Sequence, residues 1–264
     1  MISTDPAPIA QFAADSLDVR VYESRALAGR AAALDVAREI EDRLRDRGDA
    51  RIVFAAAPSQ NEFLAGLVAH RGIDWRRVVA YHMDEYLGLD ADHPASFRRY
   101  LQEHLFRLVG LGPEQLRLIP GEQADQPLRT CLAYETLLRN GPPDLVCAGI
   151  GENGHLAFND PPVADFLDPV LVKVVRLDAA CRLQQLHDGC FDRIEDVPTH
   201  AYTLTVPALL QASAVSVVVP GARKADAVLN ALRGPIAESC PASALRRHPN
   251  ARLYLDREAA RLVL

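Results

Sequence analysis

Short runs of apolar residues alternate with longer amphipathic segments along most of the chain. Residues 51–57, RIVFAAA, form a nearly unbroken apolar run, which is the pattern of a strand covered on both faces. Similar runs that we expect to form strands lie at residues 19–22, 78–82, 116–119, 145–150, 171–175, 215–219 and 252–255. Helical patterns separate most of these runs, at residues 24–48, 61–70, 96–109, 128–140 and 222–232.

This alternation predicts an α/β fold: a doubly wound, mostly parallel sheet with helices on both faces, Rossmann-like and a single domain. Residues 1–18 are rich in Pro, Ala and Asp, so we expect a loose lead-in before a domain at residues 19–264. Binding sites in such sheets lie at the carboxyl ends of the strands. We therefore expect one site where four loops meet, at residues 58–62, 84–88, 149–160 and 220–224.

Charge and composition narrow the classes of partner. The formal net charge of −6 provides no basic field for nucleic acid or anionic lipid. No window approaches the roughly 20 apolar residues of a membrane span, and the first residues lack the basic and apolar regions of a signal peptide. The five cysteines form no CxxC pair, as expected for reduced thiols. We expect a cytoplasmic protein that binds a small molecule, and the sequence leaves monomer and homo-oligomer open.

The segment MDEY, residues 83–86, brings two carboxylates to the end of a predicted strand. If the extended form persists, Asp84 and Tyr86 point to one side and Glu85 points to the other. A carboxylate at a dry strand end, with its pKa raised by desolvation, is suited to moving a proton next to a carbonyl group. From these residues alone, the alternative that Asp84 and Glu85 are turn and capping residues stays open.

A second polar segment, AGIGENGHLAFNDPP, spans residues 148–162. Its glycines, Gly149, Gly151 and Gly154, allow the backbone to approach a ligand closely. A nicotinamide cofactor is not expected, because His155 and a double proline stand where the long helix of a dinucleotide fold would begin. His155 is the candidate proton carrier, with Asp160 as its orienting carboxylate. The alternative is a buried structural histidine in a glycine turn.

Three separated motifs together resemble the glucosamine-6-phosphate deaminase/isomerase family, which is related to the 6-phosphogluconolactonases. They are M-D-E-Y followed by Gly88, G-x-N-G-H-L-A-F-N-D-P from Gly151, and G-x-x-K-A from Gly221. The similarity runs from about residue 20 to the end of the chain. The resemblance implies an enzyme that opens the ring of an aldosamine phosphate, shifts a proton between C2 and C1, and releases ammonia. It also implies that no metal or organic cofactor is needed.

The resemblance assigns roles to individual positions. Asp84 matches the enolising base, His155 the residue that assists ring opening, and Asp160 the acid that orients this histidine. Asn153 matches a position that is Asp in some members of the family, and we expect it to be one of the catalytic residues. Lys224 matches a phosphate-contacting lysine. The expected substrate contacts are Ser59, Gln60, Asn61, Tyr86, Gly151, Gly154, Arg182, His187 and Lys224.

The part of the sequence that corresponds to phosphate binding departs from the family. The family's loop after the second strand is rich in Gly, Ser and Thr, whereas residues 57–63, APSQNEF, contain no glycine. Pro58 has no N–H to donate, and Glu62 adds a negative charge near the helix N-terminus. A phosphate-binding arginine of the family falls at His187 or a neighbour. We therefore expect weak or unconventional phosphate recognition, and the exact sugar is not defined by the sequence.

Two other functions compete with an amino-sugar deaminase. A 6-phosphogluconolactonase-like hydrolase usually carries D-G-H followed by a Ser-Leu-Phe stretch and lacks M-D-E-Y. This chain has Asn153-Gly154-His155 and Asp84, which favours the isomerase side. A non-catalytic sugar-binding regulator is the second alternative. The presence of both Asp84 and His155 argues against it, while the altered phosphate loop keeps it open.

Overall fold

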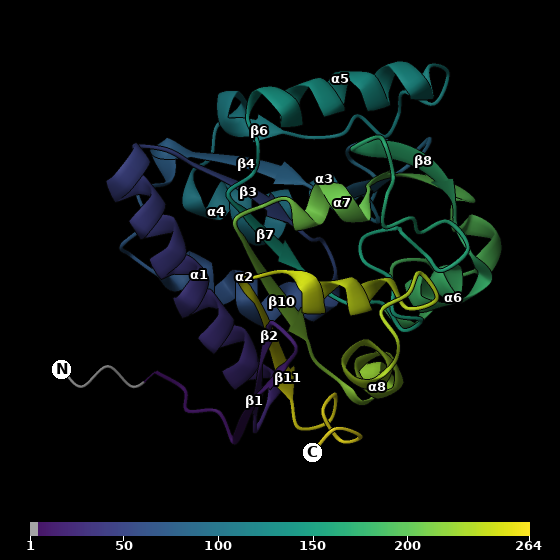
Figure 1. Cartoon of the computed structure of the whole chain (residues 1–264). Coiled ribbons are helices and arrows are strands. Elements are labelled where there is room, and N and C mark those ends of the chain that lie inside the picture. The colour runs from purple at the N-terminus through teal and green to yellow at the C-terminus, as the bar shows by residue number, and fades with distance from the viewer. Residues whose placement is uncertain (1–4) are drawn as a thin grey trace.

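The computed structural model describes residues 5–264, which form a twisted α/β sheet with helices packed on both faces (Figure 1). Within these residues the main sheet has eight strands in the order β1-β2-β11-β10-β7-β3-β4-β6, and all neighbours are parallel except β1 and β2. The strands are β1 (Ala10–Ala14), β2 (Leu17–Tyr22), β3 (Ala50–Phe54), β4 (Val78–His82), β6 (Leu116–Arg117), β7 (Leu145–Ala148), β10 (Ala214–Val219) and β11 (Ala251–Asp256). The predicted doubly wound, mostly parallel sheet is confirmed.

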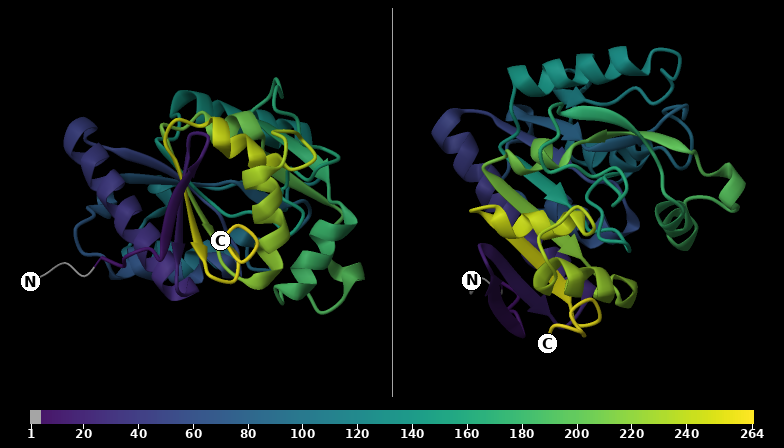
Figure 2. Two further views of the ribbon diagram at one scale, coloured as in Figure 1. Left: turned by 60° about the horizontal axis from the view of Figure 1, so that its bottom comes forward. Right: turned by 45° about the vertical axis from the view of Figure 1, so that its right-hand side comes forward.

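Alternate residues of the central strands enter two separate hydrophobic cores. In β3, Val53 joins the core beneath α5, α7 and α8, whereas Ile52 and Phe54 join the core beneath α1 and α2. Figure 2 shows these two helical layers from the side and from below. The helices are α1 (Arg25–Arg47), α2 (Asn61–Ala69), α3 (Phe97–Leu101), α4 (Arg107–Val109), α5 (Pro127–Asn140), α6 (Ala179–His187), α7 (Val206–Leu210) and α8 (Ala225–Arg233).

Helix α1 begins and ends where the sequence predicts. The Oγ of Ser24 accepts a hydrogen bond from Leu27 N at 3.4 Å, which is the N-cap interaction. Gly48 has φ +89° and its N–H donates to Leu44 O, the usual left-handed helix stop. Although α1 has 23 residues, neither it nor any other helix within residues 5–264 is both long and apolar enough to cross a membrane.

A second, three-stranded antiparallel sheet extends from the carboxyl end of β4 and corrects part of the prediction. It contains β5 (Asp84–Tyr86), β9 (His200–Leu204) and β8 (Val172–Arg176), in that order. The run at residues 171–175 is therefore a strand, but it pairs with β9 rather than with the parallel sheet. An apolar run indicates burial without identifying the neighbouring strand. Because β5 follows β4 after a single residue, Asp84 stands at the junction of the two sheets.

The N-terminal lead-in is more regular than expected. Ala10–Ala14 form β1, which pairs antiparallel with β2 in the register Ala10 to Val21. Phe12 packs against the hydrophobic core, so burial of its ring helps to hold this strand on the sheet. The expectation of a loose segment thus fails for these residues, because a two-residue turn lets them pair with the next strand.

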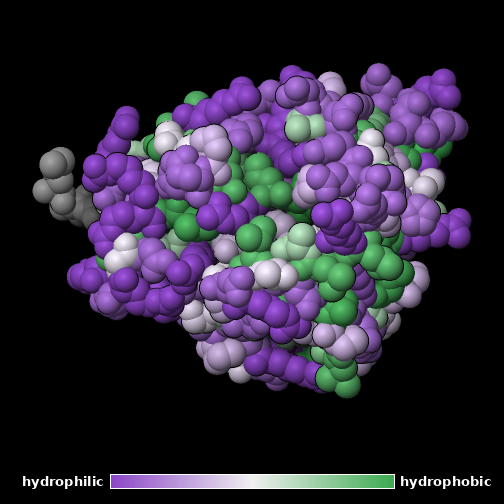
Figure 3. Space-filling model, turned by 90° about the horizontal axis from the view of Figure 1, so that it is seen from above, coloured by the Kyte–Doolittle hydropathy of each residue, from purple (hydrophilic) through white to green (hydrophobic). Residues whose placement is uncertain are grey.

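The outer face of α5 carries exposed leucines, with Leu128 76% and Leu132 66% accessible. Figure 3, seen from above Figure 1, shows a mainly hydrophilic surface on which hydrophobic groups lie near the middle and toward the lower right. Scattered exposed leucines are common on protein surfaces and do not by themselves indicate an interface.

Candidate active site

An open cavity lies where the loops after β3, β4, β7 and β10 come together. Its lining includes residues from each of the four predicted loops, among them Ser59, Asp84, Gly151 and Lys224. The convergence expected from the topology of a parallel sheet is therefore confirmed.

The two adjacent carboxylates of the MDEY segment have different surroundings. Glu85 accepts hydrogen bonds from Ser96 Oγ at 2.9 Å, Phe97 N at 3.2 Å and Arg98 N at 3.1 Å, so it anchors the start of α3. Asp84 lines the cavity, is 7% exposed, and its side chain accepts no hydrogen bond from residues 5–264. Burial, together with the nearby charge of Glu85, raises the pKa of Asp84 well above its ordinary value. Glu85 is therefore structural, and Asp84 is the carboxylate available for proton transfer.

His155 and Asp160 form a close pair at the cavity. His155 Nδ1 lies 3.0 Å from Asp160 Oδ1, an ion-pair distance, although its alignment falls short of a hydrogen bond. Asn153 Nδ2 donates to Asp160 Oδ1 at 3.0 Å, and Asn153 Oδ1 accepts from His155 N at 3.1 Å. Burial opposes ionisation of Asp160, but the contacts with His155, Asn153 and Asp178 N hold its pKa below the usual value. The carboxylate is thus kept negative beside the imidazole.

Two glycines of this loop are required by close contacts. A Cβ on Gly151 would lie 2.2 Å from His155 Cε1, so any other residue here would displace the imidazole ring from its present position. Gly154 has φ +85°, and its Cβ would lie 2.8 Å from Cys240 Sγ. The backbone therefore turns sharply under His155, and Gly154 acts through backbone geometry.

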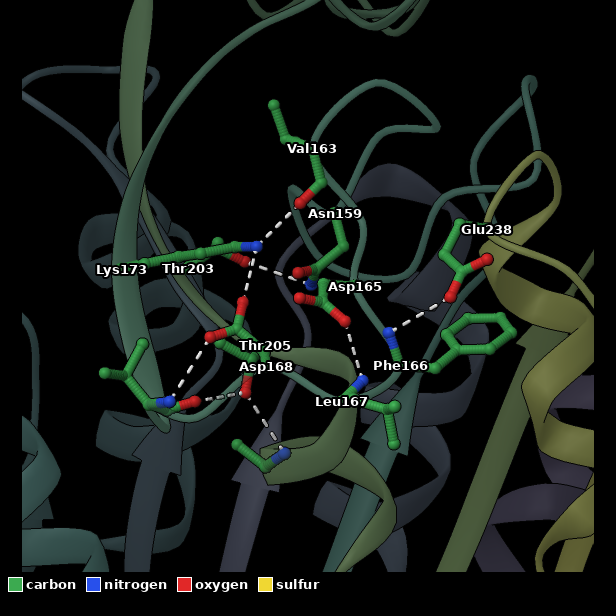
Figure 4. A network of polar contacts seen from close by, with 12 residues as sticks. Asn159, Val163, Asp165, Phe166, Leu167, Asp168, Lys173, Thr203, Thr205 and Glu238 are labelled. Atoms are coloured by element: carbon green, nitrogen blue, oxygen red, sulfur yellow. Dashed lines mark hydrogen bonds and ion pairs between the residues drawn. The ribbon is translucent and has the colours of Figure 1, made fainter.

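The second sheet braces the end of the same loop. Asn159 is fully buried, and its Nδ2 donates to Leu156 O at 2.8 Å and to Leu204 O of β9 at 2.7 Å. Beyond it, Lys173 Nζ donates to Val163 O at 2.6 Å and contacts Asp168 Oδ2 at 2.7 Å (Figure 4). These contacts fix the segment that follows His155.

Lys224 brings a buried cation to the cavity. It ends the short 3₁₀ turn after β10, is 8% exposed, and its Nζ makes no ion pair within residues 5–264. Burial lowers the pKa of Lys224, while the nearby carboxylates of Asp188 and Glu152 oppose that shift. An ammonium group with no carboxylate contact is available to a polar ligand.

Five of the expected substrate contacts lie outside the cavity lining: Asn61, Tyr86, Gly154, Arg182 and His187. Tyr86 is completely buried, and its hydroxyl donates to Gln185 Oε1 at 2.6 Å. Asn61 Oδ1 accepts a hydrogen bond from Tyr100 Oη at 2.5 Å. We therefore place Tyr86 behind the lining, where it supports Gln185, and Asn61 beside it. Of the expected loop contacts, Ser59 and Gln60 do line the cavity.

Helix α6 also differs from expectation. The guanidinium of Arg182 donates to the carbonyls of Ile194 and Val197, and His187 Nδ1 lies 3.2 Å from Glu152 Oε2. Neither Arg182 nor His187 lines the cavity, since both side chains are held by these contacts. Four residues of this region that were not assigned to the site line it instead: Gln184, Gln185, Asp188 and Cys190. Gln184 and Asp188 are four residues apart, a helical spacing that the sequence already contained.

One buried cluster within residues 5–264 has the composition of a metal site. Ligand atoms of His155, Asp160 and Cys181 all lie within 4.8 Å of one another. Metal binding requires the thiolate form of cysteine, whereas burial raises the pKa of the Cys181 thiol. Asp160 is also already engaged by Asn153 and by Asp178 N. The cluster is therefore better suited to orient His155 than to hold a cation.

Comparison with known proteins identifies the family of this site. A family model described as glucosamine-6-phosphate isomerases/6-phosphogluconolactonase matches residues 23–162. A glucosamine-6-phosphate deaminase of Listeria innocua is 33% identical over 82% of this chain and 89% of its own length. One from Exiguobacterium sibiricum is 38% identical over 72% of this chain and 73% of its own.

Two solved structures agree with these sequence comparisons. A monomeric glucosamine-6-phosphate deaminase superposes with a TM-score of 0.85 at 29% identity, over 92% of this chain and 99% of that one. A 6-phosphogluconolactonase from Thermotoga maritima shares the fold, with a TM-score of 0.74 at 18% identity over 91% of this chain and 99% of the other. The chain therefore belongs to the glucosamine-6-phosphate isomerase/6-phosphogluconolactonase family.

Proposed function

We propose that this chain is an enzyme that isomerises and deaminates an amino sugar, in the manner of its relatives named glucosamine-6-phosphate deaminase. The observation that carries the proposal is Asp84, a buried carboxylate that pairs with no group within residues 5–264 and lines the same cavity as His155, the partner of Asp160. Asp84 is suited to exchange a proton with a carbon atom of the sugar, and His155 is suited to exchange one with an oxygen atom.

The reaction begins with a cyclic aldosamine. His155 transfers the proton that opens the ring, through Nε2, because Nδ1 faces Asp160. The negative charge of Asp160 stabilises the imidazolium formed on the way, and Asn153 holds that carboxylate in place. These two residues therefore position His155 and do not exchange protons with the sugar.

Asp84 then acts on the open chain. It removes the proton from C2 while the aldehyde oxygen takes a proton from water, which gives an enolamine. It then returns its proton to C1, which leaves a protonated imine at C2. Water adds to that imine and ammonia departs, so the product is a ketose. The raised pKa of Asp84 makes its carboxylate a stronger base once it is ionised. These steps use side chains of the protein and water, and we propose no further cofactor.

A lactonase-like hydrolase is the second candidate, because 6-phosphogluconolactonases share the fold. Lactone hydrolysis would employ His155 to activate water, but it has no task for a buried carboxylate such as Asp84. The deaminase reaction therefore gives a role to both Asp84 and His155, whereas lactone hydrolysis gives one only to His155. A non-catalytic sugar-binding module accounts for neither the Asp84 environment nor the His155–Asp160 pair.

Reaction in deuterated water distinguishes these functions. We expect ammonia release from an amino sugar, together with deuterium incorporation at C1 of the ketose. Hydrolysis of 6-phosphogluconolactone without exchange would instead establish the lactonase. Sugar binding without either reaction would establish the non-catalytic module.

We further propose that the enzyme works in the cytoplasm on a free small molecule. All five cysteines are free thiols, and four of them are buried. This arrangement suits a reducing compartment. Fractionation of the native host should recover the activity with the cytoplasmic proteins.

Replacing Gly151 by Ala should reduce turnover by up to about 10²-fold, because displacement of a catalytic group by about 1 Å has an effect of that order. The new Cβ would overlap the imidazole of His155. The check is the rate of ammonia release, with the thermal melting temperature as a control for folding. Unchanged turnover in a folded Gly151→Ala protein would show that the position of His155 is not critical.

A further inference from the structure

The start of helix α2, which the family resemblance assigns to phosphate, offers few free amides. Pro58 has no N–H, Gln60 N donates to Ala57 O at 2.8 Å, and Asn61 N donates to Pro58 O. Within residues 5–264, Ala57 N and Ser59 N are the amides at the start of this turn that make no hydrogen bond. Helix N-termini bind anions through several free amides, so this one is poorly equipped to hold a phosphate.

The side chains that this loop presents to the cavity are uncharged. The Gln60 side chain is 1% exposed, and its Nε2 donates to Ser59 Oγ and to Val218 O, both at 3.2 Å. Glu62 does not line the cavity, because its carboxylate pairs with Arg25 at 2.7 Å. Repulsion by Glu62, expected from the sequence, is therefore not what weakens anion binding. The loop contributes amide and hydroxyl groups in place of charge.

An acid lines the cavity next to the position where the resemblance implies an arginine. That position falls at His187 or a neighbour, and the neighbour that lines the cavity is Asp188. Gln184 Nε2 donates to Asp188 Oδ2 at 3.3 Å, which holds the carboxylate in place. Arg223 Nη2 lies 3.8 Å from Asp188 Oδ1, whereas Arg223 Nε lies closer to Glu152 Oε1, at 3.2 Å. On the lining, Lys224 is thus accompanied by Asp188 instead of a second cation.

We propose that this site selects an amino sugar whose non-reacting end carries a neutral hydroxyl group rather than a phosphate dianion, with Asp188 and Lys224 binding that hydroxyl. A carboxylate accepts the hydroxyl proton while an ammonium group donates to the same oxygen, so both side chains are satisfied. A phosphate dianion would satisfy Lys224 but would face Asp188. The inference rests on the proposed deaminase function and defines its substrate class.

The first test compares glucosamine with glucosamine 6-phosphate. The wild-type protein should have the higher kcat/KM for the unphosphorylated sugar. Asp188→Asn, which keeps the shape and removes the charge, should shift this ratio toward the phosphorylated sugar by about tenfold or more. The matched control is Asp192→Asn, which removes an equal charge at an exposed residue outside the lining and should leave the ratio unchanged. A wild-type preference for glucosamine 6-phosphate overturns the inference.

The second test does not depend on turnover. Titration of the wild-type protein with inorganic phosphate in a calorimeter should show no saturable binding in the millimolar range. Saturable binding that Lys224→Met removes would overturn the inference. If neither sugar releases ammonia, the proposed function fails, yet this titration still decides between a phosphate site and a hydroxyl site.

Discussion

Replacing Asp84 by Asn is expected to lower the rate of ammonia release by about 10²–10⁴-fold, the usual value of general-base catalysis. Asparagine preserves the shape of the side chain but cannot accept the C2 proton. The measurement is kcat with a saturating amino sugar, together with deuterium exchange at C1. Both should fall together, because both depend on enolisation. Asp192→Asn serves as the control for loss of one exposed carboxylate.

The same substitution should make the folded protein more stable at neutral pH. Burial and the charge of Glu85 raise the pKa of Asp84, so folding favours its protonated form. The stability that this group contributes is complete below the pKa of an unfolded Asp, about 3.9, and is lost as the pH rises through the folded value. Asp84→Asn should therefore melt at a higher temperature than the wild type at pH 7, and the difference should shrink in acid.

The two readouts also separate the roles that Asp84 could have. If Asp84 is the catalytic base, the variant should have lower turnover and higher stability, because the buried negative charge that the reaction needs also destabilises the folded protein. A capping residue would give the opposite result, with turnover retained and stability reduced. Retained turnover and exchange in Asp84→Asn would contradict the assignment of the base.

The main sheet could be predicted because its strands are buried on both faces. Runs such as residues 51–57 and 215–219 are apolar at nearly every position, and this signal is local. The second sheet was harder to predict from the sequence. The β9 segment, HAYTL, becomes a strand by pairing with β5 and β8, which lie far away in sequence. Long-range pairing of this kind leaves little trace in a short window.

Backbone topology and short motifs predicted which loops form the candidate site. The carboxyl-end rule located the loops that carry Asp84, His155 and Lys224. Alternation along β5 would place Tyr86 on the same side as Asp84. The tyrosine ring packs against Phe97 and Phe158, with centroids 4.9 and 5.4 Å away, and these two rings line the cavity in its place.

The contribution of α6 depends on how that helix packs, which no local pattern specifies. Gln184 and Asp188 reach the cavity because the helix lies against the loop of His155, where Gln184 Oε1 accepts from Glu152 N at 2.8 Å. Arg182, two residues earlier, points toward the carbonyls of Ile194 and Val197. The resemblance therefore anticipated the loop of His155 at the cavity better than the side chains that surround it.

Replacing His155 by Gln should separate ring opening from enolisation. We expect kcat/KM for a cyclic amino sugar to fall by about 10²–10⁴-fold, because glutamine cannot carry the proton. An open-chain substrate, or the ketose approached in the reverse direction, should lose far less. Asp160→Asn should show the same asymmetry in a milder form, since the imidazole would remain while the carboxylate that stabilises its charged form is lost.

The control for His155 is His187→Gln, because His187 lies outside the lining and its ring is paired with Glu152. That variant should retain turnover in both directions. Equal losses for cyclic and open-chain substrates in His155→Gln would contradict the ring-opening role. They would show that His155 serves enolisation together with Asp84, or that its contacts with Asn153 and Asp160 are needed to shape the cavity. The melting temperature distinguishes these two outcomes, because disruption of that buried network lowers it whereas loss of a proton carrier does not.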